Sequence, residues 1–170
     1  MNWLANLAQK RTPWGLLALI AFTFEVTALF FQYQMGLEPC IMCIYQRTAM
    51  LGLLIAGIIG TINPHNMVFR VSALVIWGVA CIWGLLLARE HIDMQTTTDP
   101  FAFTCAFEPN FPLPLHEWIP HFFAATGDCG NIDWQFLGLS MPAWMEVIFA
   151  AFSVVFIGVV LSRLLVKKSL

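Results

Sequence analysis

Charged residues are scarce in this sequence, and their scarcity excludes an ordinary soluble domain. Only 11% of the 170 residues are charged, whereas 59% are hydrophobic. An average soluble domain carries about 25% charged residues. The mean hydropathy of +0.77 therefore indicates an integral membrane protein. We expect a single membrane domain over residues 1–170, because this length leaves no room for a second large domain.

The sequence also lacks the motifs that bind the common redox cofactors. It contains no G-x-G-x-x-G for a flavin or a nicotinamide, and no C-x-x-C-H for covalently attached haem. Any redox chemistry in this chain must therefore use its cysteines, together with an electron acceptor that these motifs do not bind.

Four apolar stretches are long enough to cross a bilayer, which takes roughly 20 residues. They run over about 14–31, 41–62, 68–88 and 144–166. None shows strict alternation, which favours helices over barrel strands. We therefore expect an all-α membrane protein with a four-helix transmembrane bundle. The first stretch exceeds the ~7–15 residues typical of a signal peptide, so we interpret it as a retained span.

The basic residues predict the orientation of this bundle. Six of the eight lie at the two ends of the chain and just after the turn that follows the second stretch, at Lys10, Arg11, Arg70, Arg163, Lys167 and Lys168, whereas Arg47 and Arg89 lie at the outer ends of helices. The positive-inside rule places these six residues, and so both termini, in the cytoplasm. The opposite side then holds a short loop at about 32–40 and a long loop at about 90–142. The long loop contains seven acids and no Lys or Arg.

Four of the five cysteines fall in or beside these outer loops, at Cys40, Cys43, Cys105 and Cys129. An oxidising compartment converts paired thiols there into disulfides. A C-x-x-C pair such as Cys40 and Cys43 is typical of redox or metal sites, because so small a loop gains little stability from closure. For Cys105 and Cys129, a structural disulfide worth about 3 kcal/mol is the alternative. We expect Cys81, in the third stretch, to be an inert core residue.

Zinc binding is the alternative role for the C-x-x-C pair. It would need four ligands, and two of them would come from Cys105 and Cys129 or from His116 and His121. The second pair lacks tight ligand spacing, and an oxidising compartment disfavours free thiolates. We therefore predict no metal.

The stretch "EPCIMCIYQR" predicts a reactive thiol at the start of a helix. Pro39 suggests that the second helix begins near Cys40. The positive end of a helix stabilises thiolates, which are the reactive form of cysteine. Cys43 and Arg47 are four residues apart and share one helix face, so Arg47 adds a permanent cation. An arginine that merely extends to the membrane surface is the alternative.

A chain that oxidises thiols repeatedly needs a terminal electron acceptor, and a quinone dissolved in the bilayer is the economical choice. Quinone oxygens gain negative charge on reduction, so Arg47 is the candidate that stabilises them. His91, just beyond the third stretch, is the candidate hydrogen-bond or proton donor. For His91, an ordinary surface histidine is the alternative.

Two further features bear on this site. Residues 113–125 predict a helix that rests in the membrane interface and holds Cys129 near the C-x-x-C pair. Its apolar face would carry Trp118, Ile119, Phe122 and Phe123. A hydrophobic loop packed on the spans is the alternative. Glu25 lies in the middle of the first stretch, where a carboxyl group is a functional candidate by default. A protonated carboxyl that hydrogen-bonds a neighbouring helix is the alternative, and we do not include Glu25 among the catalytic residues.

Several short stretches together carry a resemblance to a known family. They are "ALFFQY", "PCIMCIYQR", "EH" at Glu90–His91, "FTC" ending at Cys105, "GDC" ending at Cys129, and "DWQFLGLSMPAW" before the fourth span. In pattern, order and topology the chain resembles the disulfide bond formation protein B (DsbB) family of bacterial inner-membrane thiol:quinone oxidoreductases. The similarity extends over nearly the whole chain.

The resemblance implies a relay of two redox-active disulfides, Cys40–Cys43 and Cys105–Cys129. The periplasmic oxidase DsbA, once reduced, would attack at Cys105; Cys129 would then attack Cys40, leaving Cys43 to face the quinone beside Arg47. The exchangeable acceptor would be ubiquinone or menaquinone. The protein would be a multi-pass protein of the bacterial inner membrane, with no nucleic-acid partner. Gln46 departs from the family resemblance, because a member of that family carries Glu at this position.

Two other readings of the sequence stay open. Vitamin K epoxide reductase-like proteins also join four spans, a C-x-x-C and a quinone, but their loop pair precedes the C-x-x-C instead of following it. A small tetraspan scaffold or transporter would carry both disulfides as structural links.

Overall fold

Four long helices dominate the computed structural model, which describes residues 6–97, 111 and 114–167. They are α2 (Arg11–Tyr33), α3 (Ile41–Ile62), α4 (Met67–Thr96) and α7 (Met141–Lys167). Each is long and apolar enough to cross a membrane. The predicted all-α membrane bundle is confirmed at this level. The predicted second span coincides with α3, and the other three lie inside the observed helices.

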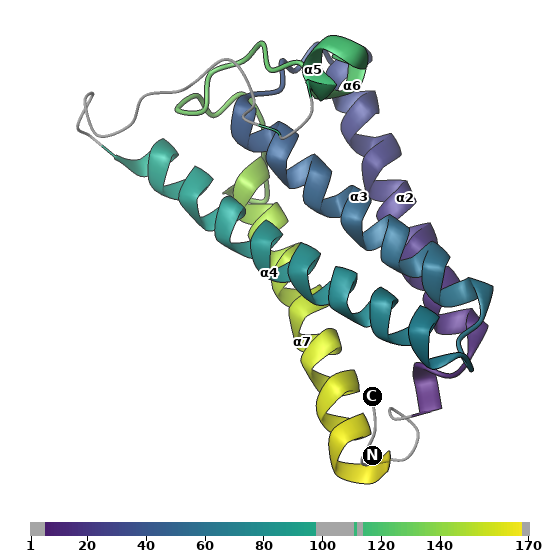
Figure 1. Cartoon of the computed structure of the whole chain (residues 1–170). Coiled ribbons are helices and arrows are strands. Elements are labelled where there is room, and N and C mark those ends of the chain that lie inside the picture. The colour runs from purple at the N-terminus through teal and green to yellow at the C-terminus, as the bar shows by residue number, and fades with distance from the viewer. Residues whose placement is uncertain (1–5, 98–110, 112–113, 168–170) are drawn as a thin grey trace.

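The helices pack in chain order. α2 packs against α3, α3 against α4, and α4 against α7. The start of α2 and the end of α7 lie at one end of the bundle, and the short helices α5 (Leu115–Trp118) and α6 (Pro120–Phe123) lie at the other (Figure 1). Segments far apart in sequence therefore meet at the end that holds the C-x-x-C pair.

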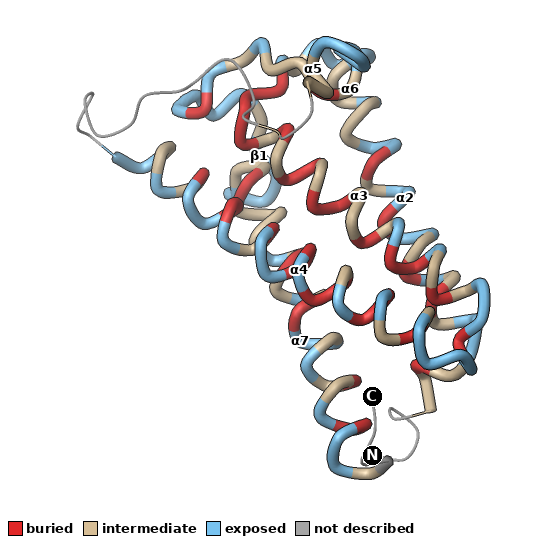
Figure 2. The backbone as a smooth tube through the Cα atoms, viewed as in Figure 1, coloured by how far each residue is buried: buried red, intermediate tan, exposed pale blue. Residues whose placement is uncertain are grey.

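Small residues let the helix backbones approach closely. A Cβ atom on Gly57 of α3 would lie 2.6 Å from the backbone nitrogen of Ala18 in α2, so no larger residue fits there. Buried residues follow the facing sides of the helices, and exposed ones follow the outer sides (Figure 2). Many exposed residues are large and apolar, among them Leu19, Val79 and Leu165. Such a surface suits contact with lipid tails.

Helix α4 continues beyond the predicted span at 68–88 and ends only at Thr96. Polar residues prolong it, and the Thr96 hydroxyl donates to the carbonyl of Ile92 at 3.0 Å. Arg89 pairs with Glu146 of α7 at 3.2 Å, which ties the two helices together at this level. The long loop predicted from residue 90 therefore begins as helix, and His91 sits on a rigid element.

The segment predicted as one helix over 113–125 is two single-turn helices instead. The break falls at Ile119, whose backbone (φ −133°, ψ 64°) is not helical, because a proline at position 120 disfavours the helical conformation of the residue before it. The apolar residues of this segment do not share one environment. Phe123 is buried, whereas Trp118 is 63% exposed and Ile119 is 50% exposed.

A small β-hairpin precedes α7 and was not predicted by the all-α class. Strand β1 (Gln135–Phe136) pairs antiparallel with β2 (Leu139–Ser140). The turn residues Leu137 and Gly138 have positive φ values of 52° and 80°, as a two-residue hairpin turn requires. The indole N–H of Trp144 donates to the carbonyl of Phe136 at 3.0 Å, which ties the hairpin to α7.

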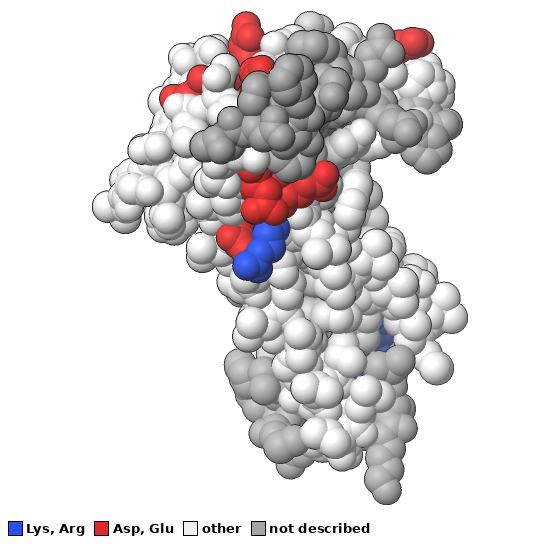
Figure 3. Space-filling view, turned by 90° about the vertical axis from the view of Figure 1, so that its left-hand side faces the viewer, with Lys and Arg blue, Asp and Glu red and all other residues white. Residues whose placement is uncertain are grey.

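Acidic side chains gather over the end of the molecule that holds α5 and α6. On the face in Figure 3, red acidic side chains lie in the upper half, with a blue basic patch directly below a red group and a smaller blue one lower on the right. Most of the surface below this level is uncharged. The end of the molecule that holds the C-x-x-C pair therefore carries acidic charge, whereas the surface below it is mostly uncharged.

Candidate functional site

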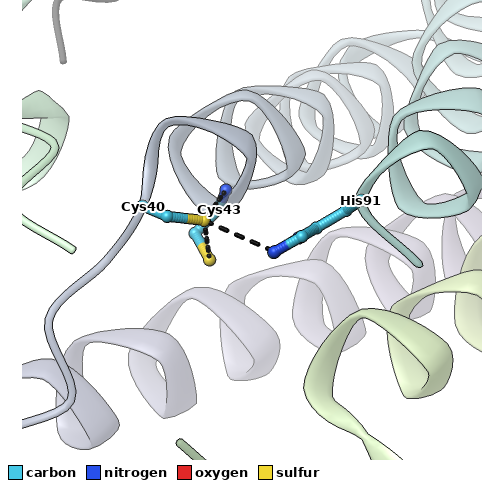
Figure 4. A group of neighbouring side chains, drawn as sticks. All are labelled: Cys40, Cys43 and His91. Atoms are coloured by element: carbon cyan, nitrogen blue, oxygen red, sulfur yellow. Dashed lines mark hydrogen bonds between the residues drawn. The ribbon is translucent and has the colours of Figure 1, made fainter. Parts of the chain in front are cut away.

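Cys40 caps the N-terminus of α3, as the sequence predicts. Its backbone is extended, and its sulfur accepts a hydrogen bond from the backbone N–H of Cys43 at 3.4 Å. The two sulfur atoms are 3.0 Å apart (Figure 4). Cys40 is 2% exposed, whereas Cys43 is half-buried. The helix start therefore brings both thiols within reach of one another and of the positive helix end.

Cys129 lies against Cys40, although 89 residues separate them in the chain. It is 1% exposed and belongs to the same small apolar cluster as Cys40. A hydrogen bond with the Cys129 side chain, a second with Cys43, and burial together raise the pKa of the Cys40 thiol far above its usual range. The reduced Cys40 thiol therefore holds its proton more tightly than an ordinary thiol.

Backbone hydrogen bonds hold the Cys129 loop in this position. The N–H groups of Thr126 and Gly127 both donate to the carbonyl of Pro39, at 2.9 and 3.1 Å. A Cβ atom on Gly127 would overlap the carbonyl oxygen of Glu38, so only glycine lets the two segments approach this closely.

His91 is buried between Cys40 and Gln46, so it is not a surface histidine. Its Nε2 lies 3.5 Å from the sulfur of Cys40 (Figure 4), and its Nδ1 lies 3.2 Å from the amide nitrogen of Gln46. The backbone of Cys129 also hydrogen-bonds to the imidazole. Because the Gln46 nitrogen is a donor, His91 Nδ1 accepts, and the ring proton lies on Nε2 toward Cys40.

Arg47 is also buried, and its guanidinium is held by groups of the protein. Its guanidinium donates to the side-chain oxygen of Gln32 at 3.0 Å and to the backbone carbonyl of Phe122 at 2.8 Å. The same group lies over the Phe122 ring, 5.0 Å from its centre. Its charge interacts with Cys43, as the shared helix face predicts. The Nε atom of Arg47 is buried and has no hydrogen-bond partner.

A cavity of about 360 Å³ opens beside Cys43. Its polar and titratable lining residues are Glu25, Thr27, Gln32, Glu38, Cys43, Gln46, Arg47 and His91. Aromatic and apolar residues from α2, the hairpin and α7 complete the wall, among them Phe31, Trp134, Phe136, Met141 and Trp144. Its volume falls within the range of small-molecule sites, and a mostly apolar wall with a few polar groups is typical of them.

Cys40 faces a different, smaller cavity of about 50 Å³. Cys43 and His91 line both cavities, so they lie between the two. The sulfur atoms are thus arranged in series, with Cys129 beside Cys40, Cys40 beside Cys43, and Cys43 on the wall of the larger cavity.

Within the described residues, one group also has the geometry of a metal site. The ligand atoms of Cys40, Cys43 and His91 all lie within 4.8 Å of one another. His116 and His121, which the zinc alternative named, do not belong to this group. Three such atoms suit Zn²⁺ only while both sulfurs are reduced, because a disulfide offers no thiolate ligand.

The structure brings together five of the six predicted site residues. Cys40, Cys43, Cys129, Arg47 and His91 form one connected group. Cys105 lies outside the described residues, so its pairing with Cys129 stays a prediction. The predicted core position of Cys81 is confirmed, since it is fully buried among core residues.

Sequence reasoning missed several partners of these residues. Gln32, which fixes Arg47, stands in the stretch "ALFFQY", but the sequence analysis gave it no role of its own. The Phe122 carbonyl is a backbone group and leaves no trace in sequence. The aromatic residues of the hairpin stand in the stretch "DWQFLGLSMPAW", whose density of aromatics between two predicted elements was the available signal.

Comparison with known proteins assigns the chain to a family. The family model described as "Disulfide bond formation protein DsbB" matches residues 10–159. A disulfide bond formation protein B of Pseudoalteromonas translucida is 69% identical over the full length of both chains. Proteins with the same description from Pseudoalteromonas atlantica and Psychromonas ingrahamii are 51% and 50% identical, over 100% and 97% of this chain and 100% and 90% of theirs. The chain therefore belongs to the disulfide bond formation protein DsbB family.

Proposed function

We propose that this protein is a protein-dithiol:quinone oxidoreductase that reoxidises a DsbA-like periplasmic oxidase and passes the electrons to a membrane quinone. Family membership supports the coarser statement, a membrane protein of disulfide bond formation with disulfide oxidoreductase activity. The finer statement rests on the site.

The arrangement of sulfurs in series carries the proposal. Thiol–disulfide exchange requires a thiolate to reach the sulfur that it attacks. Cys129 lies against Cys40, and Cys43 alone of the three borders the 360 Å³ cavity. A purely structural disulfide between Cys40 and Cys43 has no need of a third buried cysteine or of a cavity beside its second sulfur.

The residues of the cavity fit a quinone. The apolar wall suits an aromatic head group, and the buried Nε atom of Arg47 without a partner is a donor for a carbonyl oxygen. His91 and Gln46 add further polar groups on the same wall. Ubiquinone and menaquinone share the two carbonyl oxygens that these donors would bind, so both are proposed acceptors.

In the proposed relay, the thiolate of the reduced partner attacks the Cys105–Cys129 disulfide at Cys105 and forms a mixed disulfide. The second thiol of the partner resolves it, which leaves Cys105 and Cys129 reduced. The Cys129 thiolate then attacks Cys40, and Cys43 leaves as a thiolate. Attack by Cys105 on Cys129 restores the first disulfide and leaves Cys40 and Cys43 reduced.

The final step returns Cys40 and Cys43 to the disulfide. The quinone supplies an acceptor of two electrons and two protons, and becomes a hydroquinone. The start of α3 and the Arg47 cation stabilise Cys43 as the thiolate, the form that reacts. The His91 Nε2–H faces the sulfur of Cys40 and holds this end of the pair in place.

The proposal includes a placement in the bacterial inner membrane. With both termini in the cytoplasm, the loops at about 32–40 and 90–142 face the periplasm, where a DsbA-like partner works. The absence of Lys and Arg from residues 90–142 supports this orientation.

The test is quinone reduction by the purified protein supplied with a reduced DsbA-like protein and ubiquinone-1. Loss of quinone absorbance is expected for the natural sequence and for Cys81→Ala, the matched control in the core. Cys43→Ser should abolish turnover. Undiminished turnover by Cys43→Ser would mean that the relay is wrong.

A zinc site is the competing candidate, because three ligand atoms lie close together. Metal analysis of the reduced protein separates the two. A zinc protein retains one zinc per chain and protects Cys40 and Cys43 from alkylation, whereas the proposed relay leaves both thiols exchangeable. Gel-shift alkylation likewise excludes or supports a scaffold, whose disulfides would stay oxidised when the reduced partner is added.

A further inference from the structure

Glu25 is a buried acid that the relay does not use. It lies in the middle of α2, is 5% exposed, and neither of its carboxyl oxygens has a hydrogen-bond partner. A carboxyl group in such a place is costly, and its presence in a transmembrane helix points to function.

Glu25 lines the same cavity as Cys43 and Arg47. Its charge interacts with that of Arg47. The other titratable groups on this wall are Glu38 in the loop before α3, Cys43 itself, and His91 on α4. Helix α7 adds no titratable side chain to the described lining, since it contributes Met141, Pro142, Trp144, Met145 and Ile148. Glu25 is thus the acid that α2 contributes to the cavity wall, and the described residues of α7 contribute no titratable group to it.

The proposed reaction needs protons at this cavity. Reduction of a quinone by Cys40 and Cys43 moves two electrons from the sulfurs to the quinone and forms the S–S bond. The two thiols lose two protons, and the two quinone oxygens gain two. A mostly apolar wall offers few groups that can carry them.

We propose that Glu25 is the acid that protonates the reduced quinone in this cavity, an inference that rests on the proposed function. The neutral carboxyl donates one proton to a quinone oxygen and becomes a carboxylate. The Arg47 cation stabilises that carboxylate. Glu25 then recovers one of the two protons that Cys40 and Cys43 lose, and the other passes to the second quinone oxygen, so two protons leave the thiols and two reach the hydroquinone.

A purely structural role for Glu25, as the counter-charge of Arg47, makes different predictions. Loss of the counter-charge would alter the position of Arg47 and so the KM for the quinone. Loss of a proton donor lowers kcat and removes one limb of its pH profile, because general acid catalysis acts on the reacting state.

The experiment compares Glu25→Gln, Glu25→Asp and the natural sequence, with reduced DsbA-like protein and ubiquinone-1. Thr23→Val, on the lipid-exposed side of α2 and outside the cavity, is the matched control. Glu25→Gln should lower kcat about 100-fold, with KM changed less than about threefold and one pH limb lost. Glu25→Asp should retain that limb at reduced kcat, and Thr23→Val should match the natural sequence.

Several outcomes overturn the inference, and they differ from failure of the proposed function. If the natural protein does not reduce ubiquinone-1, the proposed function fails. If it does, and Glu25→Gln keeps its kcat and pH profile or changes KM alone, Glu25 is not the acid. Should Glu25→Gln not fold, infrared difference spectra of the natural protein decide. The protonated carboxyl band should disappear transiently while the bound quinone is reduced, and a band that stays unchanged throughout a time-resolved measurement would overturn the proposal.

Discussion

Arg47 of α3 donates a hydrogen bond to the backbone carbonyl of Phe122, 75 residues further along the chain, and its guanidinium covers the ring of the same residue. One side chain therefore joins the wall of the cavity to the segment that leads to Cys129. This contact couples the cavity to the segment 114–124, so a change at Arg47 should alter that segment as well as the cavity.

Arg47→Ala should loosen the segment 114–124. A hydrogen bond to a charged group contributes about 1.5–3 kcal/mol, so the amides of α5 and α6 should exchange at least about 10-fold faster. Phe122→Leu is the matched control. It keeps the backbone carbonyl and loses the contact of its ring with Arg47, worth about 0.5–1 kcal/mol, and the edge contact with the Phe123 ring. Because the hydrogen bond remains, its effect should be smaller. Equal exchange in both variants would show that the hydrogen bond does not hold the segment.

Arg47→Ala should also impair quinone reduction, by weaker binding or by slower electron transfer. Arg47→Lys keeps the charge but cannot bond Gln32 and Phe122 with the same planar fork, so it should be intermediate. The measurement is KM and kcat for ubiquinone-1. Unchanged values in Arg47→Ala would remove Arg47 from the quinone site.

Gly127→Ala should move Cys129 away from Cys40. The new methyl group would overlap the carbonyl oxygen of Glu38, so the loop must shift and its hydrogen bonds to Pro39, about 1 kcal/mol each, weaken. We expect a several-fold lower yield of the Cys40–Cys129 disulfide in a fixed redox buffer, with Cys43 and Cys105 changed to Ser.

Gly130→Ala is the control for this change. Its methyl group would lie 3.3 Å from the side-chain oxygen of Asp128, which can move. Gly130→Ala should leave the yield of the Cys40–Cys129 disulfide within about twofold of the yield with glycine at both positions. A full yield in Gly127→Ala would contradict the close approach of the two segments.

The reduced Cys40 thiol should need more alkaline solution than an ordinary thiol before it reacts. Its hydrogen bonds and burial raise its pKa. At a pH near the ordinary thiol pKa of about 8.5, little of Cys40 is therefore thiolate, and the thiolate fraction still increases at higher pH. The hydrogen bond that it donates as a neutral thiol persists at low pH and is lost as the pH rises.

Mass spectrometry of iodoacetamide labelling, from about pH 7 to 10, measures this shift against the unfolded protein. Burial slows the labelling at every pH, so the shape of the profile is the readout. In the folded protein the rate at Cys40 should still increase where the unfolded protein has reached its plateau. A plateau at the same pH in both states would contradict the raised pKa.

Gln46→Glu should move the ring proton of His91 from Nε2 to Nδ1. The Gln46 amide donates to Nδ1, whereas a carboxylate accepts, so the proton should move to Nδ1 and leave Nε2 without a hydrogen toward Cys40. Nitrogen NMR of the imidazole distinguishes the two tautomers. Gln46→Met, which neither donates nor accepts strongly, should give a mixture, and identical spectra in all three proteins would exclude this control of the tautomer.

Much of the fold follows from the sequence because the bilayer imposes simple rules. Length and hydropathy predict four spanning helices, and the span at 41–62 matches α3 residue for residue. Pro39 places the helix start at Cys40, so the shared face of Cys43 and Arg47 follows from helical spacing alone. These predictions depend only on neighbours within a few residues.

The tertiary structure alone decided what surrounds these residues. Contacts between Cys129 and Cys40, Arg47 and Phe122, and His91 and Gln46 join segments 45 to 89 residues apart. They depend on backbone carbonyls, on a glycine that lets two loops touch, and on which helices pack together, none of which local pattern encodes. The sequence by itself determined a membrane helix that begins with a reactive cysteine pair. Packing decided that a third cysteine, a histidine and a buried acid share one site with it, because only packing brings distant side chains within bonding distance.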